Sequence, residues 1–139
     1  MAGFLNTESV PRTPLYGGLL GGLVHAGLAS ALWTVLGLDD LAELAAVKAL
    51  YGLYVLFGMF ALGFVPSVFY IARGRVLPAL VVASFLILST AASWRAGPAE
   101  APQGGPTPFA FYILLWIVIV VLAALVARFE ESRVRASTQ

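Results

Sequence analysis

Four long apolar stretches alternate along the chain with short segments that carry every Asp, Glu, Lys and Arg. The stretches cover about residues 15–38, 49–72, 76–94 and 109–127. A membrane-spanning helix needs about 20 apolar residues to cross ~30 Å of hydrocarbon, so each stretch predicts one span. The pattern therefore predicts an all-α, polytopic integral membrane protein, whose residues 15–128 form a four-transmembrane-helix bundle.

The segments outside the apolar stretches have the composition expected of terminal tails, helix caps and loops. Residues 1–14 predict an N-terminal tail and residues 129–139 a C-terminal tail that continues the last helix by a turn or two. Residues 95–108 hold four prolines and three glycines, which predict an extended outer loop. Asp40 and Glu43 match a capping box, and Pro66 predicts a bend in the second span.

An alternative interpretation treats the first stretch as a secretory signal. Arg12, the apolar run and Ala29-Ser30-Ala31 resemble such a leader with its cleavage site. Glu8 and the five glycines that dilute the apolar run argue against this interpretation. We therefore expect the first stretch to remain in the bilayer.

Composition excludes several classes of protein. Hydrophobic residues make up 60% of the chain and charged residues 11%, whereas soluble domains are about 45–50% apolar and about 25% charged. The net charge of +1 and the lack of a basic patch argue against nucleic-acid binding. The chain has no cysteine, which excludes disulfides and thiolate chemistry.

The distribution of basic residues predicts the orientation. With four spans, the termini and the 73–75 turn lie on one side with six arginines, against Lys48 and Arg95 on the other side. Lys/Arg bias in short loops marks the cytoplasmic side, so both termini are predicted to be cytoplasmic (N-in/C-in). The preference for arginine over lysine suggests the plasma membrane of a prokaryote. The aromatic residues expected at the outer interface are Trp33, Tyr51, Tyr54, Trp94 and Tyr112, and those expected at the inner one are Tyr16, Tyr70 and Phe129.

Small residues recur at a spacing of four in the first span. Such rows let helices approach closely inside a bilayer, either within one chain or between two copies. We predict a helix-packing surface made of Gly17, Gly18, Gly21, Gly22, Ala26 and Ser30.

His25 lies beside this row and is the one ionisable side chain near the middle of a span. An intramembrane ionisable residue is a candidate functional site, and we name His25, Ser84 and Ser89 as candidate ligand or ion contacts. No charged residue lies deep in a span to partner it, so a neutral imidazole bonded across a helix contact is the competing interpretation. We expect His25 to face the bundle interior, near Ser84 or residues 58–63.

The sequence predicts no catalytic set, metal site or cofactor. None of the usual motifs occurs, and a single histidine leaves few side chains that could carry out catalysis. The first hypothesis is a small accessory, assembly or interaction subunit, whose partners are the lipid bilayer and another membrane protein or a second copy. The second is a small homo-oligomeric channel or transporter with a path near His25 and the serine face of the third span. The third is a haem-bearing or enzymatic membrane subunit.

Overall fold

The computed structural model describes residues 13–38, 46–97 and 107–137. Within these ranges the chain is helical and has no strand. Five helices have described bounds: α1 (Thr13–Val35), α3 (Ala49–Arg73), α4 (Leu77–Ala96), α5 (Pro108–Leu114) and α6 (Trp116–Ser137). The predicted capping box at Asp40 and Glu43, the first 12 residues and most of the outer loop lie outside the described residues.

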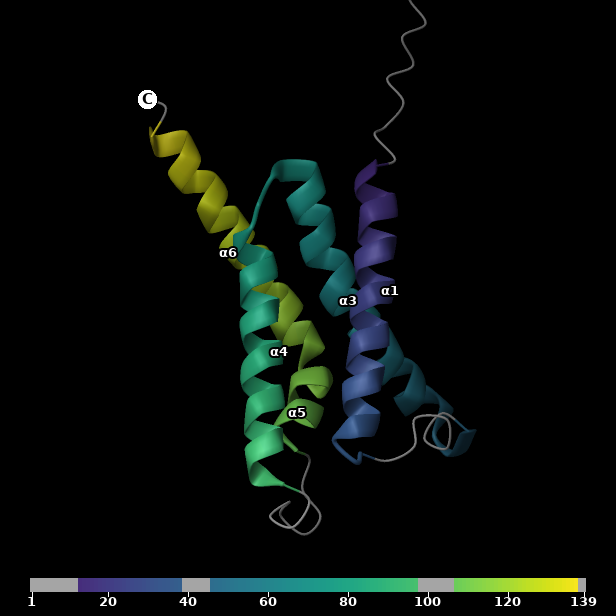
Figure 1. Cartoon of the computed structure of the whole chain (residues 1–139). Helices are drawn as coiled ribbons and strands as arrows, with labels where there is room; N and C mark the ends of the chain where they lie inside the picture. Colours follow the sequence, from purple (N-terminus) through teal and green to yellow (C-terminus); the bar gives the residue numbers. More distant parts are fainter. Residues whose placement is uncertain (1–12, 39–45, 98–106, 138–139) are drawn as a thin grey trace, which may run out of the picture.

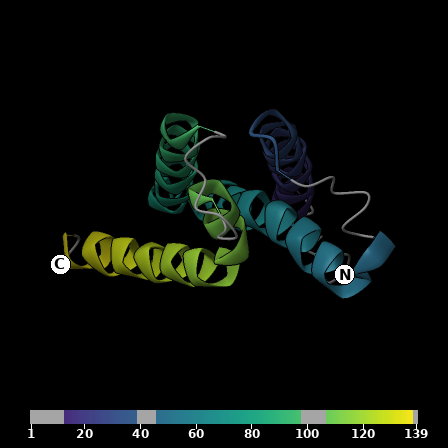
Figure 2. The same cartoon turned by 90° about the horizontal axis from the view of Figure 1, so that it is seen from below.

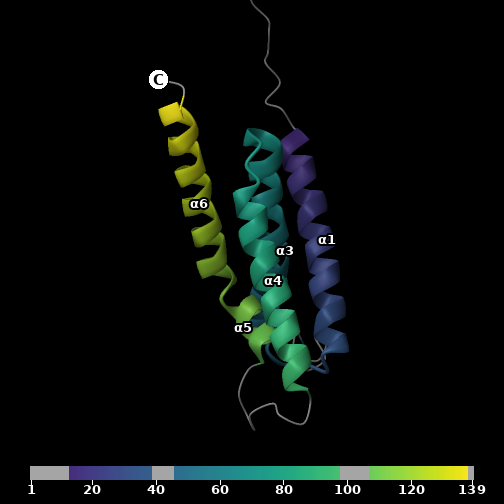
Figure 3. The same cartoon turned by 60° about the vertical axis from the view of Figure 1, so that its left-hand side comes forward.

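The long helices run up and down beside one another (Figure 1). The start of α1, the turn between α3 and α4 and the end of α6 lie at one end of the molecule in both side views (Figures 1 and 3). The helices α1, α3 and α4 are each long and apolar enough to cross a membrane, and α5 with α6 makes a fourth candidate if the bent pair counts as one span. The structure thus supports an all-helical protein with three to four apolar membrane-span candidates.

The turn between α3 and α4 has the backbone that the sequence favours there. Gly74 adopts a left-handed conformation with φ 63°, which glycine accepts without strain. Its N–H bonds the Tyr70 carbonyl oxygen at 2.8 Å, and the Arg75 N–H bonds the Phe69 carbonyl oxygen at 3.3 Å, which closes the end of α3. Pro78 lies in the first turn of α4, where its missing N–H costs no hydrogen bond.

The fourth apolar stretch differs from its prediction. One continuous helix was expected over 109–127, but the chain bends by 68° between α5 and α6. The Tyr54 hydroxyl of α3 donates to the Leu114 carbonyl oxygen at the bend, over 2.6 Å. At the start of α5, the Thr107 side chain accepts from the Ala110 N–H and the Ser93 hydroxyl accepts from the Phe109 N–H. These side chains satisfy the ends of the short helix α5, so it stays separate from α6.

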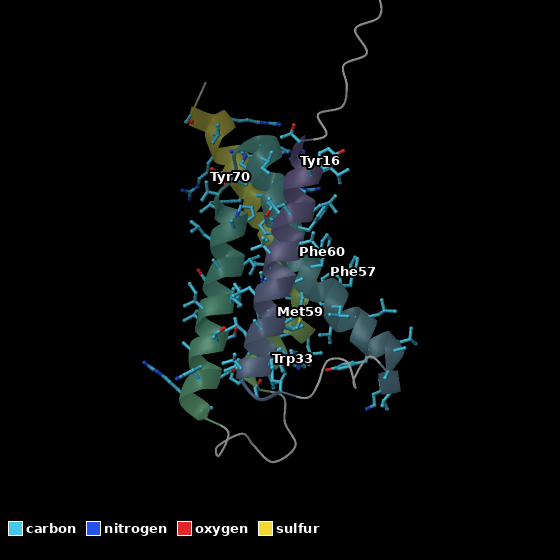
Figure 4. The ribbon with its side chains drawn as sticks, turned by 45° about the vertical axis from the view of Figure 1, so that its right-hand side comes forward. Tyr16, Trp33, Phe57, Met59, Phe60 and Tyr70 are labelled. Atoms are coloured by element: carbon cyan, nitrogen blue, oxygen red, sulfur yellow. The ribbon has the colours of Figure 1, made fainter. Side chains whose placement is uncertain are left out.

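The closest helix contact joins α1 to α3. Gly21 and Gly63 face each other there, and a Cβ on Gly63 would overlap the Gly21 carbonyl oxygen and the His25 Cβ. Pro66, buried one turn further on, lies within α3 and does not end it. Figure 4 shows α1 crossing in front of α3, with Tyr16 and Tyr70 at the end where α1 begins and Trp33 at the other.

We expect the substitution Gly63→Ala to destabilise the fold, because the added methyl group meets backbone that has no room to move. Overpacking of this kind typically costs about 1–3 kcal/mol of unfolding free energy. The control is Gly27→Ala on α1, where an added Cβ meets nothing within 4 Å. Denaturant titration of the purified protein in mild detergent measures both variants. Equal stability of the two variants would contradict the close α1–α3 contact.

Candidate functional site

His25 lies on the inner face of α1 and is 9% exposed. Its Nδ1 is 2.6 Å from the backbone carbonyl oxygen of Met59 in α3. Its Nε2 is 2.8 Å from the hydroxyl of Tyr112 in α5. One imidazole therefore connects three helices that are distant in sequence.

The two partners determine which imidazole nitrogen carries the proton. A carbonyl oxygen only accepts hydrogen bonds, so Nδ1–H must be the donor to Met59. Nε2 of the neutral ring then accepts from the Tyr112 hydroxyl. Both ring nitrogens are satisfied without any charge, which suits an apolar interior where an unpaired polar group is costly.

Aromatic rings surround this hydrogen-bonded group. Tyr112 is 3% exposed and its ring centroid lies 6.1 Å from that of Phe109, a fully buried residue. Phe109 in turn meets the edge of Trp33 from α1 at 6.5 Å between centroids. The core thus has a polar centre with an aromatic wall toward the end of α1.

The sequence predicts Tyr112 and Trp33 among the aromatic residues of the outer interface, and the structure buries both side chains in the core. Their level in a membrane stays a prediction. Tyr112 belongs to α5, whose separation from α6 turns this residue toward His25. The sequence did show two hydrogen-bonding side chains, His25 and Tyr112, within otherwise apolar spans. It gave no indication that these two side chains meet. The Met59 carbonyl had no signal at all, because any backbone oxygen is an equivalent acceptor in the sequence.

The predicted small-residue row faces α3 along several turns. The three glycines nearest the start of α1 meet side chains in the second half of α3: Gly17 is against Ile71, Gly18 is against Val68 and Phe64, and Gly21 is against Ser67 and Gly63. Further on, Gly22 meets the Phe60 ring, Ala26 packs on the core cluster and the Ser30 hydroxyl lies 3.6 Å from the Met59 sulfur. Their importance for stability stays a prediction.

The two serines predicted as ligand contacts lie away from His25. The Ser84 hydroxyl donates to the Leu80 carbonyl oxygen at 2.7 Å, and the Ser89 hydroxyl donates to the Leu86 carbonyl oxygen at 3.1 Å. Both thus bond within α4, as hydroxyls in apolar helices commonly do. Of the two expected neighbourhoods of His25, the structure has the one at residues 58–63.

An apolar groove of about 550 Å³ runs between α1, α3 and α4 and reaches the edge of His25. Its few polar side chains include Ser67 and Tyr70. No group of three or more His, Asp or Glu residues that could hold a metal ion occurs in the part of the chain that the structure describes. The hydrogen bonds of His25 join three helices, and both of its ring nitrogens have a partner.

Comparison of the chain with protein-family models, with curated proteins and with solved structures finds no match.

We expect Tyr112→Phe to destabilise the protein by about 0.5–2 kcal/mol, the range found for hydrogen bonds between membrane helices. The loss follows because His25 Nε2 is left without a donor. Tyr51→Phe, at an exposed ring of α3, is the matched control and should change little. Denaturant titration in detergent measures each variant.

A double-mutant cycle with His25→Leu isolates the pair. Once His25 is replaced, Tyr112→Phe should cost less than it does in the original chain, because the partner is already gone. Strictly additive losses would show that the two side chains do not interact.

Proposed function

We propose that this chain is a four-span protein of a prokaryotic plasma membrane and acts as a small accessory, assembly or interaction subunit. The observation that supports this most is the state of His25. His25 lies near the middle of the apolar helix α1, and its two ring nitrogens bond Met59 and Tyr112. A histidine whose two ring nitrogens are both hydrogen-bonded inside the protein stabilises the helix packing. It has no free nitrogen to offer a substrate or a ligand.

The outward surface supports the same proposal. Large apolar side chains are exposed on every described long helix, as expected for helices in contact with lipid or with other membrane helices. In α1 the exposed set includes Leu20, Leu23 and Val24, and in α6 it includes Val118 and Leu125. Such helices offer sideways contact surfaces to a partner within the bilayer.

The proposed cytoplasmic end carries a cluster of arginines and glutamates. Arg73, in the last turn of α3, lies 3.5 Å from Glu131 of α6, and Arg135 lies 2.8 Å from the same carboxylate. Arg75 follows Arg73 closely in the sequence, and Arg128 and Arg133 lie on either side of Glu131. Positive residues of this kind favour the inner face of a membrane.

The second candidate, a channel or transporter, has one observation in its favour. The groove of about 550 Å³ between α1, α3 and α4 reaches His25, near the middle of α1, and Ser67 in the second half of α3. Against this candidate, Ser84 and Ser89 bond within their own helix and contribute no polar wall to it.

Reporter fusions test the topology. Fusions of a cytoplasm-active reporter after Gly74 and after Gln139 should both be active, and the same fusion after Gly97 should be silent. The reason is that the first two positions belong to the end with most arginines. Activity after only one of Gly74 and Gln139 would refute the four-span, N-in/C-in arrangement.

Purification of the tagged full chain from its native membranes in mild detergent tests the accessory function. We expect a stoichiometric membrane-protein partner to remain bound through size-exclusion chromatography. The matched measurement is solute flux into liposomes containing the chain alone. Flux that His25→Ala abolishes, with no retained partner, would favour the channel and contradict the accessory subunit.

A further inference from the structure

A second groove follows α4 along the side that faces α1. Its volume is about 510 Å³. Its walls are mainly apolar side chains of α4 together with one residue of α1: Leu32, Leu86, Ile87, Thr90, Ala91, Trp94 and Arg95. Seen from below, α1 and α4 stand apart on the same side of α3 (Figure 2), and α1 packs mainly on α3. Among the described residues, little covers the facing side of α4.

The length of this groove matches one leaflet of a bilayer. It extends along α4 from Arg95 to Leu86, and this part of the helix rises about 14 Å at 1.5 Å per residue. One leaflet accounts for half of a hydrocarbon core ~30 Å thick, which is about 15 Å. An acyl chain lying along the groove would thus begin at Arg95 and end at Leu86, where the first groove begins.

Arg95, at the mouth of the groove, is the one charged side chain among the described residues that line this groove. Arg95 is exposed in the last turn of α4, and no hydrogen bond or ion pair joins its guanidinium to the rest of the described chain. Trp94 beside it is 68% exposed, and tryptophan is enriched at the level of lipid headgroups. A guanidinium binds a phosphate through two parallel, charge-assisted hydrogen bonds.

We propose that an anionic glycerophospholipid occupies the groove between α1 and α4. One acyl chain lies against Leu86, Ile87 and Ala91, and the phosphate pairs with Arg95. A transmembrane helix of a partner fits these observations less well, because it needs the full thickness of the membrane and has no use for a cation at the mouth. The lipid fills the space that the sparse contact between α1 and α4 leaves open.

Native mass spectrometry of the full chain tests this proposal. The protein is reconstituted in vesicles of equal parts phosphatidylglycerol and phosphatidylcholine and then released into mild detergent. We expect one phosphatidylglycerol per chain to be retained in preference to phosphatidylcholine. The variant Arg95→Gln should reduce that retention roughly tenfold, which corresponds to about 1.4 kcal/mol. The matched control Arg128→Gln changes an exposed arginine within α6 that lines neither groove, and this variant should retain the lipid.

A second pair of variants separates the groove from the helix surface in general. Ala91→Phe fills the groove, whereas Ala92→Phe changes an exposed alanine of the same helix that lines neither groove. The bound lipid should be lost in the first variant and kept in the second. Ile87→Trp, which narrows the groove from another turn, should behave as Ala91→Phe does.

Three results would overturn the proposal. The first is a wild-type chain that retains no phosphatidylglycerol, and the second is equal retention by Ala91→Phe and Ala92→Phe. The third uses the absence of cysteine from the chain. If Ala91→Cys forms an efficient disulfide-linked dimer in native membranes, a second copy occupies the groove in place of a lipid.

Discussion

A neutral imidazole with both nitrogens bonded is the constraint on which the packing of this protein depends. His25 can reach the Met59 carbonyl only because α1 and α3 approach closely where Gly21 meets Gly63. It can reach the Tyr112 hydroxyl only because α5 lies against the same pair of helices. In an apolar interior, an imidazole that loses either partner has no water to replace it. The positions of three helices are therefore coupled through one side chain.

The bend at Leu115 depends on the same requirement, namely that every polar group in an apolar interior needs a hydrogen-bond partner. A straight helix over the fourth apolar stretch would satisfy its own backbone, so a break needs other partners for the freed groups. The Tyr54 hydroxyl supplies one at the Leu114 carbonyl oxygen, and Trp116 packs against Gly58 just beyond the bend. At the opposite end of α5, Ser93 and Thr107 accept backbone N–H groups. Side chains from α3, from α4 and from the residue before α5 thus hold a short helix that its own sequence would have continued.

The sequence predicts the membrane-type helices well because their signal is local. The apolar lengths, the glycine at position 74 and the proline at position 78 place α1, α3 and α4 to within a few residues. Tyr112 and the bend could not be predicted, since both depend on hydrogen bonds between residues far apart in sequence. The hydrogen bond of Ser84 within α4 could not be predicted for a similar reason. A hydroxyl in an apolar helix bonds its own backbone unless a neighbour comes close, and the sequence does not show which neighbours do.

The two sides of α1 show how this chain divides its contacts. The side toward α3 has glycines pressed against aromatic and aliphatic side chains, so it is closed. The side toward α4 opens into apolar grooves along most of the helix. A pore would need polar groups along a path through the bundle, but the central polar groups, His25 and Tyr112, are bonded to each other. In the proposed four-span arrangement, the open surfaces face sideways into the bilayer, where a lipid or another membrane protein can meet them. This arrangement supports the proposed interaction subunit, which acts through lateral contacts.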